Sequence, residues 1–196
     1  MTFKSGFTNE HSAVRWELAP GPLRAAAGFT YQEFSNLEQP LALKGDPFHV
    51  CEENKVRTWV EFLQLETAKP LAFYDHPFFG RWPAVTSNKF GSGTLIYEGT
   101  VLSDKLQQAV VLDALREAAL TGPDQQLPSS VRVKHGVSHD GRKLHYFLNY
   151  SSSPVTLAYS YAAGTDLLTG QSLVQGQQTS LAPWDLIIAK ENLQNH

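Results

Sequence analysis

A stretch rich in proline, glutamine and serine, over residues 122–130, constrains this chain more than any other feature. Such a composition indicates a loop between two periodic segments. Before it, helical and strand patterns are mixed, whereas after it we find only short alternating segments. The sequence therefore predicts two domains, residues 1–121 and residues 131–196, joined by a linker over residues 122–130.

One long helix is predicted in the N-terminal part. Ser103 is a favourable N-cap residue, and apolar side chains recur near the helical period from Leu106 onwards. Gly122 followed by Pro123 is expected to stop the helix. An apolar stripe of this width predicts packing against a sheet.

The strands of the N-terminal part predict an incomplete α/β fold. Residues 84–88 and 94–98 flank a turn that contains glycine, which indicates a β-hairpin. A complete doubly wound domain would repeat strand–helix units along the chain. Because there is one long helix, residues 1–121 are predicted to be the later part of an α/β domain.

The C-terminal part predicts a small antiparallel β-sandwich, because short strands follow one another at close spacing. Alternating apolar residues line one face of a strand, namely Leu144, Tyr146, Leu148 and Tyr150. Trp184 is expected on the final strand and, as a core residue, on the same face as the apolar residues that follow it.

Composition and charge exclude several classes of protein. The chain has 196 residues, of which 42% are hydrophobic, and its net charge is -3. Without a basic excess, a nucleic acid partner is not expected. No apolar run is long enough to span a membrane, and the first residues have no signal-peptide core. The single cysteine, Cys51, excludes an intrachain disulfide, and together these features predict a cytoplasmic protein.

Sequence motifs with a known chemical mechanism are missing. The sequence has no dinucleotide-binding or phosphate-binding glycine loop, no zinc-protease motif, no nucleophile elbow and no paired cysteines. Its seven histidines show no metal-ligand spacing on a regular element. We therefore predict no catalytic residue, no metal site and no cofactor in this chain.

Aromatic residues are densest over residues 73–83. Phe78, Phe79, Arg81 and Trp82 are candidates for a protein interface or a sugar contact, because aromatic rings and arginine are frequent at such sites. The alternative is that these rings only fill the core between two layers. Consecutive rings cannot all face inward, which is why a contact role stays open.

Several segments resemble the family 42 glycoside hydrolases. The central one contains His76-Pro77-Phe78 and, further on, a glycine and a Pro-Ala step. The segments that carry the resemblance run from one end of the chain to the other: residues 3–10, 74–86, 90–94, 97–100, 164–170 and 181–185.

The resemblance implies a β-galactosidase, but only its C-terminal portion. Enzymes of this family carry a (β/α)₈ barrel with both catalytic glutamates, then a flavodoxin-like trimerisation domain and a small β-sandwich. This chain is similar to the later part of the trimerisation domain plus the sandwich, so no catalytic residue carries over. The implied fold is α/β followed by all-β: a partial flavodoxin-like trimerisation module and a small antiparallel β-sandwich.

The same resemblance implies that the chain is a non-catalytic assembly and accessory part of an enzyme that hydrolyses terminal β-galactosides. The implied partners are further copies of the chain, in a trimer, and the catalytic barrel of the parent enzyme. Two alternatives come from other classes: a stand-alone carbohydrate-binding or scaffolding protein, and a small hydrolase with its own site.

Overall fold

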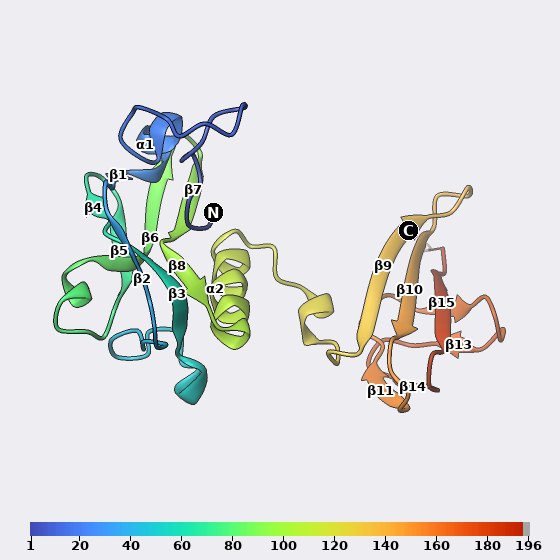
Figure 1. The fold of residues 1–196 in the computed structure, drawn as a ribbon. Helices are drawn as coiled ribbons and strands as arrows, with labels where there is room; N and C mark the ends of the chain where they lie inside the picture. The colour runs from blue at the N-terminus through green and yellow to red at the C-terminus, as the bar shows by residue number, and fades with distance from the viewer. Residues whose placement is uncertain (194–196) are drawn as a thin grey trace. The chain divides into compact units, whose positions relative to one another are not determined.

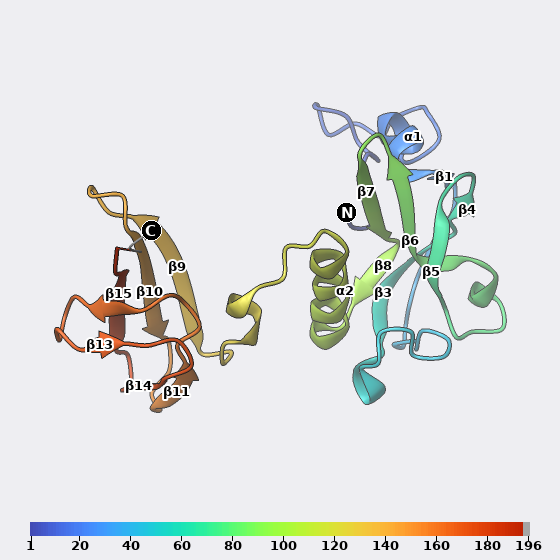
Figure 2. The ribbon, with the colours of Figure 1, turned by 180° about the vertical axis from the view of Figure 1, so that it is seen from behind.

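The computed structural model describes residues 1–193, and Figures 1 and 2 show its fold from two opposite sides. It divides into two compact units, Met1–Ala119 and Leu120–His196. Among the described residues, no helix is both long and apolar enough to cross a membrane. Each unit is built mainly from short strands, and we describe them separately.

The first unit contains three small antiparallel sheets, with strand orders β2-β3-β8, β5-β6-β7 and β1-β4. Its elements follow one another as η1 (Gly21–Leu23), α1 (Arg24–Ala27), β1 (Phe29–Thr30), β2 (Phe34–Asn36), η2 (Cys51–Glu53), β3 (Val56–Glu61), β4 (Gln64–Leu65), β5 (Lys69–Phe73), η3 (Phe79–Arg81), β6 (Pro83–Phe90), β7 (Gly93–Glu98), β8 (Thr100–Leu102) and α2 (Asp104–Glu117).

The predicted hairpin is β6 and β7, which pair antiparallel and lie next to each other in Figure 1. Its last pair joins Phe90 to Gly93, so the turn is tight. Gly91 has a φ of 57°, a left-handed conformation that glycine adopts at little cost. The hairpin prediction is therefore confirmed.

Helix α2 begins where the sequence predicts. The Ser103 hydroxyl accepts a hydrogen bond from the Leu106 amide at 3.3 Å, as an N-cap residue does. The helix ends at Glu117, before the predicted stop at Gly122, because Ala119 already has a left-handed φ of 54°.

The main core of the first unit lies between α2 and the strands. Leu106 and Val110 of the helix are buried against Val56 and Val60 of β3 and Leu102 of β8. This is the packing that the apolar stripe of the helix predicts. A second, smaller cluster of buried residues lies between α1, β1 and β7 and consists of Ala27, Phe29, Tyr31, Leu63, Ala68 and Tyr97.

The first unit corrects part of the α/β prediction. It is rich in β-structure, and its named strands all pair antiparallel. Parallel pairing is confined to one isolated bridge between Thr2 and Glu98. Three consecutive strands, β6, β7 and β8, precede α2 without a crossover helix, so helix and strand do not alternate as a doubly wound domain requires.

The second unit holds a five-stranded antiparallel sheet, in the order β13-β12-β15-β10-β9, and a two-stranded sheet of β11 and β14. Its elements are η4 (Pro123–Gln126), β9 (Val131–Val137), β10 (Lys143–Asn149), β11 (Val155–Ala158), β12 (Gly164–Asp166), β13 (Ser172–Leu173), β14 (Gln178–Leu181) and β15 (Leu186–Glu191).

One core joins these two sheets, which gives the unit the character of a small sandwich. Phe147 of β10 and Ile187 of β15 are buried from the larger sheet, and Leu157 of β11 and Leu181 of β14 from the smaller one. Two sheets that bury their inner faces against each other are the defining feature of this architecture.

Strand β10 buries the face that the apolar pattern did not favour. His145, Phe147 and Asn149 are buried, whereas Leu144 and Tyr146 are only partly buried on the other face. The Asn149 side chain is satisfied there because its amide donates to two backbone carbonyl oxygens, each at 2.8 Å. A polar residue that finds such partners can occupy a core position at little cost.

Trp184 is not a core residue, which contradicts the prediction. It precedes β15 in a turn, its φ is 59°, and 67% of its surface is exposed. The turn is held by the Trp184 amide, which donates to the Ser151 carbonyl at 3.1 Å. The alternation with Leu186 therefore does not extend back across the turn.

Candidate functional site

The four residues predicted as contact candidates lie together around η3, between β5 and β6. His76 organises this loop, because its Nδ1 accepts hydrogen bonds from the amides of Phe78 and Phe79, each at 3.1 Å. The His76 ring also stacks on Phe79, with centroids 4.5 Å apart. A histidine with this role is a structural cap for the loop.

Arg81 lies between two aromatic rings of the same loop. Its guanidinium is 4.7 Å from the ring centroids of both Phe78 and Trp82, and its Nε donates to the Phe78 carbonyl at 3.2 Å. Trp82 in turn stacks on Phe62, with centroids 4.3 Å apart and nearly parallel planes. The structure thus brings all four candidates into one cluster.

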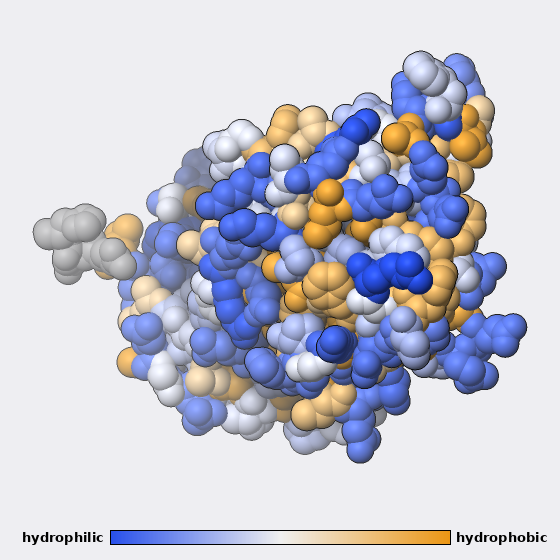
Figure 3. Space-filling model, turned by 90° about the vertical axis from the view of Figure 1, so that its left-hand side faces the viewer, coloured by the Kyte–Doolittle hydropathy of each residue, from blue (hydrophilic) through white to orange (hydrophobic). Residues whose placement is uncertain are grey.

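The cluster is anchored at one end and open at the other. Phe79 and Trp82 pack against the main core, whereas Phe78 is 47% exposed. Figure 3 shows the side of the first unit that lies on the left in Figure 1, where apolar side chains are scattered among hydrophilic ones. An exposed aromatic ring on a loop that Arg81 braces suits an apolar contact better than acid–base chemistry.

A buried carboxylate holds the first unit together from inside. Glu61, at the end of β3, is fully buried. One of its oxygens accepts from the Lys4 amide at 2.8 Å and from Trp59 Nε1 at 3.3 Å, and the other accepts from the Tyr97 hydroxyl at 2.8 Å. Burial raises the pKa of Glu61, and these hydrogen bonds oppose the rise.

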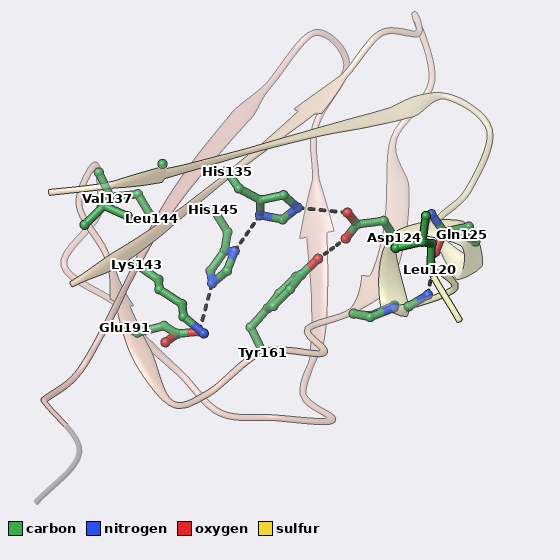
Figure 4. A pocket seen from close by; sticks show the side chains of 13 residues that line it. Leu120, Asp124, Gln125, His135, Val137, Lys143, Leu144, His145, Tyr161 and Glu191 are labelled. Atoms are coloured by element: carbon green, nitrogen blue, oxygen red, sulfur yellow. Dashed lines mark hydrogen bonds and ion pairs between the residues drawn. The ribbon is translucent and has the colours of Figure 1, made fainter. Parts of the chain in front are cut away.

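The second unit contains a line of titratable side chains that sequence motifs did not reveal (Figure 4). His135 Nε2 is 2.8 Å from an Asp124 oxygen, and His135 Nδ1 is 2.9 Å from His145 Nδ1. His145 Nε2 is 2.9 Å from a Glu191 oxygen. The Tyr161 ring stacks on His145 with centroids 3.8 Å apart, and its hydroxyl donates to Asp124.

Four separate elements supply this line. Asp124 comes from η4, His135 from β9, His145 from β10 and Glu191 from β15. The two histidines are direct partners across the β9–β10 ladder, which fixes their side chains on one face of the sheet. They line a cavity of about 530 Å³ whose walls are mostly apolar.

Burial and hydrogen bonds shift the pKa values of two of these groups, Asp124 and Tyr161. Partial burial alone would raise the pKa of Asp124, but hydrogen bonds from Tyr161 and His135 outweigh it and hold that pKa below its usual value. Burial and then the contact with Asp124 raise the pKa of Tyr161. Asp124 is therefore an anion that Tyr161 stabilises without giving up its proton.

A metal does not explain this arrangement. Within residues 1–193, no three His, Cys, Asp or Glu side chains converge so that they could hold a metal ion. The two carboxylates are already bonded to the outer nitrogens of the histidines. The signal that could have pointed to the line is the placement of two histidines, ten residues apart, on either side of the Asp140-Gly141 turn.

Comparison with known proteins identifies the family. A family model described as the β-galactosidase trimerisation domain matches residues 1–121, which is more than half of the chain. The chain belongs to the β-galactosidase trimerisation-domain family. The resemblance to family 42 β-galactosidases that the sequence shows is thereby confirmed.

Curated relatives of this trimerisation domain are β-galactosidases. The chain is 26% identical over 194 residues to β-galactosidase LacA of Lactobacillus acidophilus, covering 96% of the chain and 27% of LacA. It is 28% identical over 158 residues to β-galactosidase BgaB of a Geobacillus species, covering 81% of the chain and 23% of BgaB. The chain thus spans about a quarter of the length of these relatives.

Solved structures share the fold. A β-galactosidase from Bacillus circulans matches 97% of the chain with a TM-score of 0.85 at 24% identity, over 28% of its own length. A β-galactosidase from Rahnella matches 98% of the chain with a TM-score of 0.81 at 23% identity, again over 28% of its length. The trimerisation domain and the sandwich are therefore an architecture that larger β-galactosidases also contain.

Proposed function

We propose that this chain is the non-catalytic assembly and accessory part of a β-galactosidase. The observation that carries the proposal is the match of residues 1–121 to a family described as the β-galactosidase trimerisation domain. The relatives' names add the parent reaction, hydrolysis of terminal β-galactosides, which in glycosidases of this kind needs two facing carboxylic acids. We place that acid pair outside these 196 residues, on the catalytic barrel of the parent enzyme.

The domain boundaries belong to the same proposal: a trimerisation-type domain over residues 1–121, a linker over residues 122–130 and a sandwich over residues 131–196. We further propose that the first domain is the later part of a flavodoxin-like module, whose parallel strands come from the parent enzyme. The isolated parallel bridge between Thr2 and Glu98 supports this. The single cysteine supports a cytoplasmic location.

Self-association, as a trimer, is the proposed activity of the chain itself. The aromatic cluster is our candidate contact, since Phe78 is half-exposed and the Arg81 guanidinium lies over its ring. A protein contact fits better than a sugar contact, because Trp82 is already engaged by Phe62 and by Arg81 and offers little free ring face.

Light scattering on the purified 196-residue chain tests the proposal. We expect an oligomer at micromolar concentration, and Phe78→Glu should shift it towards monomer, because burying an unpaired charge at an interface is costly. Phe90→Glu is the matched control, since Phe90 is 56% exposed at the tip of the β6–β7 hairpin. A wild-type monomer at high micromolar concentration would overturn self-association.

The non-catalytic role has its own test. The wild-type chain should not hydrolyse a chromogenic β-galactoside above the buffer rate. Turnover that disappears when an acid within these 196 residues is replaced would contradict the proposal, whatever the oligomeric state.

A further inference from the structure

Trp16 is the most exposed large apolar side chain in the described part of the chain, with 92% of its surface accessible. It lies on a segment of the first unit, residues 7–18, that we call the arm. Two more apolar side chains of the arm, Val14 and Leu18, are also exposed. Because tryptophan is highly buried on average, an exposed group of this kind indicates a contact surface.

The arm is held in shape by its own hydrogen bonds. The Asn9 amide donates to the Ala13 carbonyl at 2.9 Å, and the Asn9 side-chain oxygen accepts from the Ala13 amide at 3.0 Å. The Arg15 amide then donates to the Phe7 carbonyl at 3.0 Å. A bend over residues 16–18 follows, in which three consecutive side chains are exposed. The arm therefore presents its indole from a hydrogen-bonded base.

A hollow of about 190 Å³ opens beside Trp16. Its apolar walls come from Phe7, Trp16, Leu18, Ala19 and Tyr31. An apolar cavity of roughly 150 Å³ is enough to hold one benzene molecule. The hollow on the arm therefore has room for one phenyl ring.

The charges at this hollow favour a cationic partner. Arg15 and Glu17 both border it. Arg15 is already engaged, because its Nε donates to the Thr8 carbonyl at 3.1 Å. Among the described residues, Glu17 forms no ion pair. The hollow thus combines an aromatic wall with an unpaired carboxylate, and a surface with an apolar ring and a free cation would complement it.

The loop around η3 is such a surface. Phe78 is half-exposed there, and the Arg81 guanidinium lies over its ring, 4.7 Å from the centroid. Within residues 1–193, Arg81 forms no ion pair. Asp75, the acid of residues 73–83, does not pair with it. The loop therefore offers one ring and one uncompensated positive charge.

A trimer with three-fold symmetry needs two different surfaces on every copy. Rotation by a third of a turn sets a patch of one copy against a different patch of the next, so the contact is heterologous. The η3 loop can supply one of these patches, but not both. In Figures 1 and 2 the arm, ahead of α1, and the loop between β5 and β6 lie apart in both views. One copy therefore cannot join its own arm to its own loop.

We propose that Phe78 of one copy enters the hollow beside Trp16 of a second copy, and that Arg81 then faces Glu17 across the contact. This inference rests on the proposed self-association and names the second surface that a trimer requires. Each copy offers one arm and one loop, so three such contacts close the ring. Aromatic rings and arginine at the centre of a contact are the residues that contribute most to binding.

Light scattering on mixed variants of the full chain tests which surfaces meet. Trp16→Glu spoils the arm and Phe78→Glu spoils the loop. Each variant alone should be monomeric where the wild type assembles, with the midpoint of assembly raised roughly tenfold or more. Because Trp16 is almost fully exposed, Trp16→Glu should keep the melting temperature of the wild type.

An equal mixture of the two variants should form a dimer and no trimer. The intact arm of Phe78→Glu fits the intact loop of Trp16→Glu, and the remaining arm and loop are both spoiled. A closed ring is held by three contacts and this dimer by one, so the mixture is measured at roughly tenfold higher concentration than the wild type.

Charge reversal tests the polar part of the contact. Glu17→Arg and Arg81→Glu should each weaken assembly, and the chain that carries both changes should regain it, because every copy supplies both partners. Glu10→Arg is the matched control, since Glu10 is an exposed acid elsewhere on the arm. Combined with Arg81→Glu, it should not restore assembly.

The outcomes separate this contact from self-association itself. A wild-type monomer at high micromolar concentration would overturn both. A wild-type oligomer that Trp16→Glu leaves intact would overturn the contact alone, and so would a mixture of the two variants that stays monomeric or forms a trimer. If Glu10→Arg restores assembly as well as Glu17→Arg does, Arg81 does not face Glu17.

Discussion

Replacing Glu61 offers a sharp test of how the first unit is held together. Glu61→Leu removes a buried acceptor while keeping a similar volume, and Glu61→Gln keeps the volume and one acceptor oxygen. In the wild type, three donors converge on this carboxylate: the Lys4 amide, Trp59 Nε1 and the Tyr97 hydroxyl. The two variants therefore differ in how many donors they leave unpaired.

The expected cost follows from those contacts. A buried donor left without a partner costs about 1–3 kcal/mol. Because the Lys4 amide is only partly buried and the Trp59 bond is long, we expect Glu61→Leu to lose about 3–5 kcal/mol of unfolding free energy. Glu61→Gln should lose about 1 kcal/mol, since its oxygen can accept from Lys4 and Trp59 while its amide donates to the Tyr97 oxygen.

Glu61 also makes the stability of the first unit depend on pH, and its raised pKa sets the direction of that dependence. Burial raises the pKa of Glu61 above its unfolded value of about 4.3. Its stabilising contribution is therefore complete below that pH and is lost as the pH rises through the folded-state pKa. Burial likewise raises the pKa of Glu98, but comparing wild type with Glu61→Gln cancels that contribution. As the pH rises, the unfolding free energy of the wild type should therefore fall relative to that of Glu61→Gln.

Urea unfolding followed by tryptophan fluorescence measures both effects. A Trp184→Phe background leaves tryptophans only at positions 16, 59 and 82, so the signal reports the first unit. If Glu61→Leu and Glu61→Gln unfold at the same urea concentration, the hydrogen bonds to this carboxylate do not stabilise the unit and our reasoning is wrong.

Three further predictions concern single residues and can be checked by thermal unfolding. Gly28→Ala should cost more than about 1 kcal/mol, because φ is +72° and a Cβ would lie 2.6 Å from the Asn88 side chain; Gly91→Ala, with φ +57° but open space, should cost less. Ser103→Ala should cost about 1 kcal/mol through the lost N-cap, and no change in the melting temperature would refute that assignment. Trp184→Ala should change the free energy of unfolding by less than about 0.5 kcal/mol, because the ring is mostly exposed. Trp184→Gly should stabilise the protein, because glycine adopts the left-handed φ of 59° without strain. A loss of several kcal/mol in either variant would show that Trp184 is a core residue after all.

Local signals in the sequence predicted local structure well. Ser103 begins α2 and Gly91 closes the β6–β7 hairpin, because a cap and a positive φ depend on a few neighbouring residues. The aromatic cluster could also be predicted, since its four members lie within five consecutive residues. The loop packs against Phe62, which lies between β3 and β4, and this partner was not predictable from the loop's own sequence.

Period-two patterns were less informative in the second unit, because they do not say which face is inside. On β10 the buried positions are His145, Phe147 and Asn149, and two of these three are polar. They are tolerated because partners arrive from distant parts of the chain, Glu191 for His145 and the Ala182 carbonyl for Asn149. Hydropathy alone assigns such residues to the surface, so it misses polar groups whose partners are brought by the fold.

The line of titratable groups in the second unit could not be predicted from the sequence either. Its members stand at positions 124, 135, 145 and 191, and only the histidines are related by one hairpin, formed by β9 and β10. A search for metal or catalytic motifs depends on fixed spacings within one element, whereas this line is assembled across four. Its three hydrogen bonds join four side chains that only the fold brings together.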